Sequence, residues 1–356
     1  DLCRKDDPLH LDLLAVIQET GLQSEQFDVV LDSVRVMGSP TTKIIWNDAL
    51  AEKQLRALIA NEVPLLGLKD SDQVLHLNNL MNSMGVHKFF EYSQREFVDF
   101  LTEIQGRHSS LPYNNFTLTI ATAAHLLRLY NIGKTLIDRV LSPDDRALMF
   151  LSVLALNYKH PGFTENFLVE TDDPIALRYN CKNVLKSYCV VEFLSFLNEK
   201  HFFTRVEVLT AANTSAKKLS ELEIRKSCTE FIMSVFTHSD VSRYAYFMAA
   251  VKGANYSISS LHKKKLCSLL LLIAQVSVLG IDYLEATEWS RRLRVQLLMQ
   301  QKKEAEKMLP ISRAPDLAQY SKEVVIPLLE VLTLMCNDYS SMVYQAKHTR
   351  QQVLSK

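Results

Sequence analysis

The sequence predicts an all-α protein, a compact domain built from many helices. Only nine glycines and ten prolines occur in 356 residues, too few for the frequent tight turns of an all-β chain. Apolar residues recur at helical spacing along nearly the whole chain, and hydrophobic residues make up 47% of it. A chain of this length can bury a sizeable core, arranged as one large domain or two smaller ones.

Two clear helices are predicted to follow one another between residues 77 and 104. The first is expected to stop at Gly85, because glycine favours helix ends. The second begins with a capping box, in which Ser93 and Glu96 satisfy free amides of the first turn. The apolar residues expected to face the core are Leu77, Leu80, Met81, Met84, Phe97, Phe100, Leu101 and Ile104.

A third clear helix is predicted to begin after Ser142. Serine is a favoured N-cap, Pro143 suits the first helical position, and the acids at 144–145 complement the helix dipole. The helix must end near Pro161, because the residue before a proline disfavours the α conformation. Its expected core residues are Leu148, Leu151, Leu154 and Ala155.

The chain divides into three predicted parts. Residues 1–61 form a helical N-terminal extension that includes a linker-like stretch, residues 62–345 form the main domain, and residues 346–356 form a polar C-terminal tail or helix end. The run 299–307 is rich in Lys, Glu and Gln and is expected to be a solvated helix end, with a partner-binding surface as the alternative.

Charge and cysteine content exclude several classes of protein. Forty basic residues balance forty acidic ones, so nothing in the overall charge indicates a nucleic-acid partner or a membrane surface. The longest apolar run is too short and too polar to cross a bilayer. Six scattered cysteines form no CxxC pair, which favours a reducing, cytoplasmic location over a disulfide scaffold or a zinc knuckle.

One stretch, between residues 156 and 180, carries a specific pattern of residues. The pattern consists of His160, Pro161, Gly162, Asn166, Thr171, Pro174, Ala176, Tyr179 and Asn180. With these residues the chain resembles the class I cyclic-nucleotide phosphodiesterases, and ordered matches extend from about Val63 to Asp338. The resemblance implies the compact, many-helix (HD-type) fold of that family.

The catalytic residues of the family do not match. The resemblance places leucine, asparagine or glutamine at the family's metal-ligand positions, and neither leucine nor neutral amides can replace the imidazoles and carboxylates that hold two divalent cations. The proton-donor histidine is likewise replaced, and lysines stand at two acidic positions. We therefore expect no metal, no cofactor and no catalytic residue at these degenerate positions, which are Asn114, Leu118, Leu156, Asn157, Lys159, Lys186 and Gln275.

A vestigial nucleotide pocket is a separate expectation. The resemblance aligns Leu317 with the glutamine that holds the base and Tyr320 with the phenylalanine that stacks on it. Tyr113 matches the tyrosine that opens another family motif, aligned with residues 113–119. Tyrosine keeps an aromatic face, but leucine offers the purine edge no hydrogen bond. His160 is expected to be a hydrogen-bonded structural histidine, with a lone metal ligand as the alternative.

These features favour a catalytically inactive phosphodiesterase-like domain that serves as a structural or scaffold component. Protein partners in a larger assembly are expected, and a cytoskeletal or ciliary assembly is conceivable for such a module. The alternative is a sensor that binds cAMP or cGMP weakly without hydrolysing it. A residual enzyme would need a new cluster of His, Asp or Glu near residues 114, 157 and 275, and the sequence has none there.

Overall fold

The computed structural model describes residues 68–90, 92–203, 220–233 and 260–355, and the predicted extension 1–61 lies outside these ranges. The described residues form helices and connecting loops without a strand, which confirms the predicted all-α fold. The helices of the first half are α4 (Asp70–Ser83), α5 (Val86–Phe89), α6 (Gln94–Arg107), α7 (Phe116–Ile132), α8 (Lys134–Val140), α9 (Pro143–Ala155), α10 (Glu165–Glu170), α11 (Pro174–Arg178) and α12 (Val184–Glu199).

The second half of the chain contributes the remaining helices. They are α14 (Glu221–Met233), α16 (Ser260–Ser277), α17 (Tyr283–Glu306), α18 (Leu317–Tyr320), a π-helical turn η3 (Ser321–Val325), α19 (Ile326–Met335), a 3₁₀ turn η4 (Asn337–Tyr339) and α20 (Ser340–Leu354). Helix α20 continues through residue 346 to Leu354, so residues 346–354 belong to a helix that starts before them. No helix among the described residues has the length and apolar character needed to cross a membrane.

Local sequence signals set the helix ends where they were expected. The Ser93 side chain accepts a hydrogen bond from the amide of Glu96, whose carboxylate accepts one from the Ser93 amide in return. Ser142 and Asp145 form the same reciprocal pair at the start of α9, with Pro143 in the first turn. These caps satisfy amides that have no partner within the helix.

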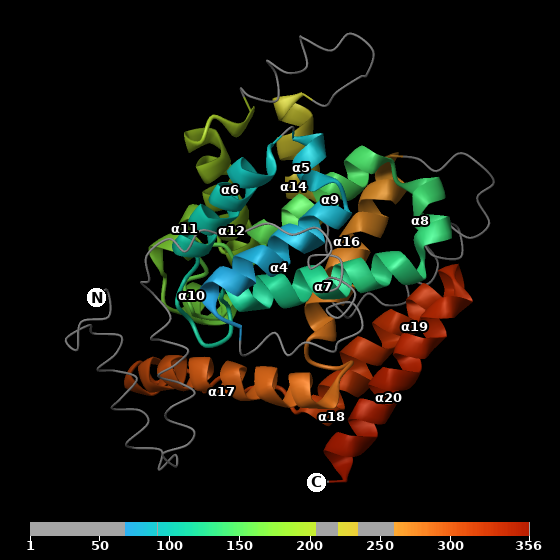
Figure 1. Ribbon diagram of the computed structural model, residues 1–356. Helices are drawn as coiled ribbons and strands as arrows, with labels where there is room; N and C mark the ends of the chain where they lie inside the picture. The colour runs from blue at the N-terminus through green and yellow to red at the C-terminus, as the bar shows by residue number, and fades with distance from the viewer. Residues whose placement is uncertain (1–67, 91, 204–219, 234–259, 356) are drawn as a thin grey trace.

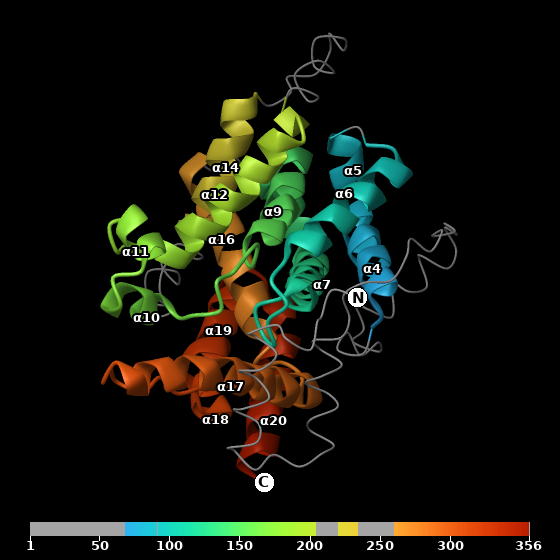
Figure 2. The ribbon, with the colours of Figure 1, turned by 90° about the vertical axis from the view of Figure 1, so that its left-hand side faces the viewer.

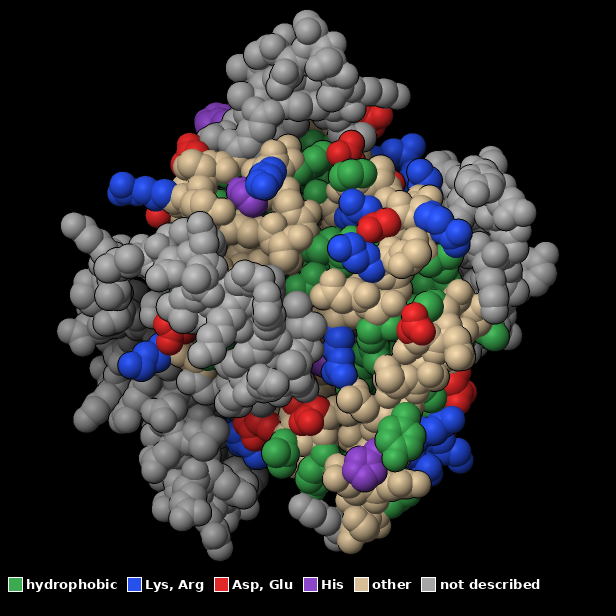
Figure 3. Space-filling model, turned by 45° about the vertical axis from the view of Figure 1, so that its right-hand side comes forward, with side chains coloured by type: hydrophobic (Ala, Val, Ile, Leu, Met, Phe, Trp, Pro, Cys, Tyr) green, Lys and Arg blue, Asp and Glu red, His purple; other side chains and the backbone are tan. Residues whose placement is uncertain are grey.

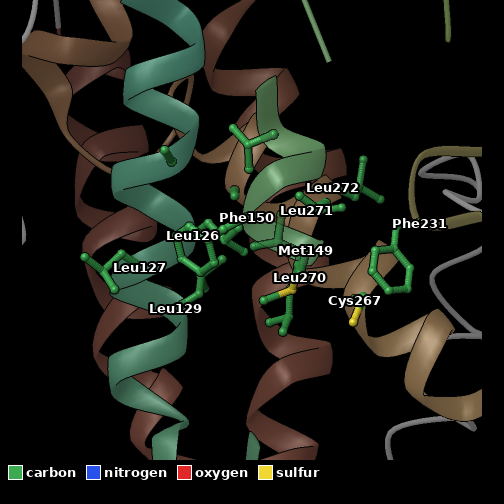
Figure 4. Close-up of a cluster of buried hydrophobic side chains, with 14 of the residues drawn as sticks. Leu126, Leu127, Leu129, Met149, Phe150, Phe231, Cys267, Leu270, Leu271 and Leu272 are labelled. Carbon is green, nitrogen blue, oxygen red and sulfur yellow. The ribbon is translucent and has the colours of Figure 1, made fainter. Parts of the chain in front are cut away.

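The core is centred on α7, α9 and α16. Helix α16 packs along α7 and also contacts α9 and α14 (Figure 1). Figure 4 shows the contact from within, where Leu126 and Leu129 of α7 lie near Phe150 of α9 and Leu270 of α16. All four side chains are fully buried, so this region supplies much of the hydrophobic stabilisation.

Helices α17 to α20 lie at one end of the described body (Figures 1 and 2). Two hydrogen bonds fasten this end to the core: the Tyr339 hydroxyl donates to the carbonyl of Leu129, 2.7 Å away, and the Thr349 hydroxyl donates to the carbonyl of Ile281 at 2.8 Å. A glycine at position 133 allows the first contact, because a Cβ there would collide with the Tyr339 ring.

Candidate functional site

The two loops that carry the recognised motifs meet against the long helix α17. Gln296 of α17 makes the connection, and its side chain is 4% exposed. Its Oε1 accepts hydrogen bonds from the amides of Tyr113 and Asn114 at 3.2 and 3.0 Å. Its Nε2 donates to the carbonyl of Gly162 at 3.2 Å. A single buried amide therefore joins the 111–115 loop to the 160–164 loop.

A second buried amide lies one helical turn further along α17. Gln300 accepts a hydrogen bond from the Thr164 amide at 2.7 Å and donates to the Thr164 hydroxyl at 2.8 Å. Its Nε2 also lies within hydrogen-bond distance of Glu304 and of the Ser312 hydroxyl. We call Gln296, Gln300 and Glu304, with the groups they bind, the α17 brace.

Glu304 is a buried carboxylate within this brace. Its Oε2 accepts from the Ser312 amide at 2.7 Å, and its Oε1 accepts from the Ser312 hydroxyl at 2.6 Å. Burial opposes the charged form, but the hydrogen bonds from Ser312 and Gln300 outweigh it and hold the pKa of the Glu304 carboxyl below its ordinary value. Glu304 is therefore charged at neutral pH, and neutral donors stabilise its charge.

The residues at the predicted degenerate positions come from three elements of the core. Leu118 on α7 is 1% exposed and belongs to the main hydrophobic cluster, and Leu156 at the end of α9 is half-buried and packs against it. Asn157 is buried, and Gln275 on α16 is half-buried. Within the described ranges no hydrogen bond or ion pair joins these side chains to one another. The Nδ2 of Asn157 has no partner there.

The two lysines at the predicted site have different surroundings. The ammonium group of Lys159 lies 2.8 Å from the Glu192 carboxylate, so the side chain pairs with α12. Its backbone has a positive φ of 52°, a conformation uncommon for a residue with a side chain. Burial lowers the pKa of Lys186, and the nearby Glu165 partly offsets this.

His160 anchors the start of the 160–164 loop. Its Nδ1 accepts a hydrogen bond from the amide of Gly162 at 3.0 Å, and its carbonyl accepts one from the Ser109 hydroxyl at 2.7 Å. Burial lowers its pKa to about 4, so the ring is neutral at pH 7. This environment supports the predicted hydrogen-bonded structural role.

Three aromatic residues lie near the brace. The rings of Tyr113 and Trp289 are 5.8 Å apart and nearly perpendicular. Burial is the main reason that the pKa of Tyr113 is raised, with a further contribution from the charge of Tyr320. Burial also raises the pKa of Tyr320 to about 12. Leu317, on the same short helix as Tyr320, is buried.

Comparison with known proteins identifies the family of this chain. The family model described as 3′,5′-cyclic nucleotide phosphodiesterase matches residues 113–346. The chain belongs to this family. The matched region begins at Tyr113 and ends within α20, so it includes most of the 111–115 loop, all of the 160–164 loop and the whole of α17.

The curated relatives of this phosphodiesterase-family chain are distant and longer. A human dual specificity calcium/calmodulin-dependent 3′,5′-cyclic nucleotide phosphodiesterase 1B is 22% identical over 67% of the chain and 41% of its own length. The 3′,5′-cyclic-AMP phosphodiesterase 4 of Dictyostelium discoideum is 27% identical over 47% of the chain and 15% of its own length. The chain thus spans less than half the length of these relatives.

A solved structure has the same fold. It is the phosphodiesterase domain of the RhoPDE fusion protein from the choanoflagellate Salpingoeca rosetta, with a TM-score of 0.72 and 17% sequence identity. The match covers 86% of this chain and 97% of that domain. At this identity the likeness establishes the phosphodiesterase fold.

In this phosphodiesterase-family chain, the side chains at the predicted metal-ligand positions can be compared with the ligands that two divalent cations require. Leu118 and Leu156 have no donor atom, and the amides of Asn157 and Gln275 carry no charge to offset two divalent cations. Among the described residues, no three His, Cys, Asp or Glu side chains gather closely enough to hold a metal ion. The side chains at these positions do not fit the family's two cations.

The α17 brace was not predicted from the sequence. Residues 299–307 were expected to be solvated, which is wrong for Gln300 and Glu304, 0% and 2% exposed. Gln296, Gln300 and Glu304 recur every four residues, so they lie on one face of the helix. The sequence signal for a buried role was this polar stripe beside buried Trp289 and half-buried Leu293. The hydrogen-bond partners of Gln296 and Gln300 lie more than 130 residues away in the chain, so only the fold shows them.

Proposed function

We propose that this domain does not hydrolyse cyclic nucleotides and acts as a structural component that contacts other proteins through its surface. The observation that carries the proposal is the set of residues at the predicted metal positions: Leu118, Leu156, Asn157 and Gln275. Leu118 in particular belongs to the continuous hydrophobic core, where a metal ion would have no ligand.

The chemistry of hydrolysis supports the same proposal. In the family, two cations supply the attacking hydroxide and a histidine protonates the leaving oxygen. The resemblance puts Asn114 at the histidine's position. An amide side chain has no proton to give in the physiological range, and the Asn114 backbone is bound to Gln296. Asn114 therefore cannot act as the proton donor.

Neutral and apolar groups at these positions allow such a domain to remain folded without metals. Losing the metal ions from an active site leaves the buried charges of their ligands unpaired, which destabilises a protein unless apolar or neutral groups replace those ligands. Leucine and amides are replacements of this kind. The α17 brace joins the motif loops through hydrogen bonds that require no metal.

A cyclic-nucleotide sensor is the second candidate. The half-buried aromatic residues Tyr113 and Tyr320 favour it, because aromatic rings can stack on a purine. Leu317 argues against it, since the residue aligned with the base-holding glutamine is a buried leucine. For both candidates, the protein partners and any cytoskeletal or ciliary assembly remain predictions.

Calorimetric titration of the purified chain with cAMP and cGMP tests these candidates, in the presence and absence of Mg²⁺, Mn²⁺ or Zn²⁺. The scaffold proposal expects no binding heat, no bound metal and no hydrolysis. Saturable binding of a nucleotide without metal, lost in Tyr320→Ala, would replace it with the sensor. Stoichiometric binding of two metals with measurable hydrolysis would refute both.

A further inference from the structure

The loop that follows α17 exposes an unusual set of apolar side chains. Met308 is 93% exposed and Ile311 is 47% exposed, and Leu309 and Pro310 stand between them. We call residues 307–313 the α17 tip. The end of α17 that leads to it lies beside α10, at the edge of the described body (Figures 1 and 2).

The tip is held firmly although it is exposed. The Leu309 amide donates to the carbonyl of Glu304 at 2.8 Å, and Ser312 is bound to the Glu304 carboxylate through both its amide and its hydroxyl. Gln301 adds a bond to the Ser312 carbonyl. These bonds fix both ends of the loop to the last turns of the helix, so the apolar side chains are presented in a defined position.

Met308 stands at a position that glycine would normally occupy. Its φ is +55°, as is common for the residue that follows a helix end, where a side chain is disfavoured. Methionine at this place is unfavourable for the backbone, and its exposed side chain gains nothing from burial within the chain. An unfavourable conformation held by its surroundings is typical of functional positions.

Positive charges flank the apolar residues. Lys302, Lys307 and Arg313 are exposed, and within the described ranges none of them has an ion-pair partner. Lys303 lies 4.6 Å from the centre of the Phe163 ring and is also exposed. Glu306 is the only exposed acid between residues 302 and 313. By contrast, basic and acidic side chains are interspersed on the face shown in Figure 3.

We propose that the α17 tip docks on the surface of an anionic lipid bilayer. Apolar side chains enter the interface while flanking lysine and arginine side chains are attracted to acidic headgroups. A fluid bilayer needs no matching pocket, so it suits apolar residues that project from the end of a helix. The net charge of the whole chain is zero, so it gives no indication of this local excess of positive charge. The proposal does not depend on whether the domain binds or cleaves a nucleotide.

Vesicle co-sedimentation of the full 356-residue chain tests the proposal. Vesicles of phosphatidylcholine with phosphatidylserine should bind the chain, vesicles of phosphatidylcholine alone should bind it much less, and added salt should weaken the binding. Replacing Lys302, Lys307 or Arg313 by Gln should weaken binding about fivefold for each charge removed. The double variant Met308→Asp, Ile311→Asp should abolish sedimentation.

A matched control separates docking at the tip from a general surface effect. Leu222 on α14 is 72% exposed, and Leu222→Asp should leave vesicle binding unchanged. Circular dichroism of each variant checks that it is folded. Absence of binding to anionic vesicles at low salt would overturn the proposal and leave the tip to a protein partner. Equal binding by the wild type and the tip double variant would also overturn it.

Discussion

The α17 brace makes a quantitative prediction about Gln296. In Gln296→Leu the side chain becomes one atom shorter and apolar, and it loses three hydrogen bonds, those to the amides of Tyr113 and Asn114 and to the carbonyl of Gly162. A buried polar group that loses its partner costs about 1–3 kcal/mol. Tyr113 and Asn114 are half-buried, so water recovers part of this loss. We expect a decrease of about 3 kcal/mol in the free energy of unfolding.

Urea unfolding followed by circular dichroism measures this decrease. The control is Gln319→Leu, which removes an exposed amide whose contact with Glu323 is 3.2 Å long. That change should cost less than about 0.5 kcal/mol, as surface substitutions usually do. If the free energy of unfolding of Gln296→Leu lies within about 0.5 kcal/mol of the wild-type value, the motif loops do not depend on the brace and the reasoning is wrong.

Three further predictions concern the core, the metal and the pH dependence. Leu118→Ala should lower the free energy of unfolding by about 2–5 kcal/mol, measured in urea, because it leaves a cavity in the core. EDTA should leave the thermal midpoint unchanged in differential scanning calorimetry, whereas a midpoint that falls with EDTA and returns with Zn²⁺ would show a structural metal. Burial lowers the pKa of His108 and of His160 to about 4 in the folded chain, below the ordinary 6.5, so the unfolded chain binds more protons in this range. Stability should therefore be complete above about pH 6.5 and should fall as the pH decreases towards 4, with a shallower fall in His108→Gln.

The parts of the fold that depend on neighbouring residues were predictable from the sequence. Ser93 and Ser142 each cap a helix through a residue three positions away, so the pattern contains both partners. The helical periodicity of the first three helices likewise placed their buried residues correctly, for example Phe97, Leu101 and Leu151.

The arrangement of the candidate site was predictable only in part. The motif at His160 identified the family and the turn, because its residues are adjacent in the chain. The orientation of Lys159 could not be predicted, since its partner Glu192 belongs to another helix. The role of Gln296 could not be predicted for the same reason, because its partner Asn114 lies 182 residues away in the chain. Glutamine on a helix is compatible with both solvent and a buried loop, and packing decides between them.

The α17 brace also bears on how this phosphodiesterase fold would stay assembled if it holds no metals, as we propose. Cations that bridge several loops contribute to holding those loops together, so their loss alone would loosen a site. Here Gln296 and Gln300 join the motif loops through neutral hydrogen bonds, and Leu118 extends the core. Each of these groups stabilises the frame whether or not a cation is present. The frame is then under no physical requirement to keep metal ligands, and its remaining constraints are packing, the turn at His160 and the exposed surfaces.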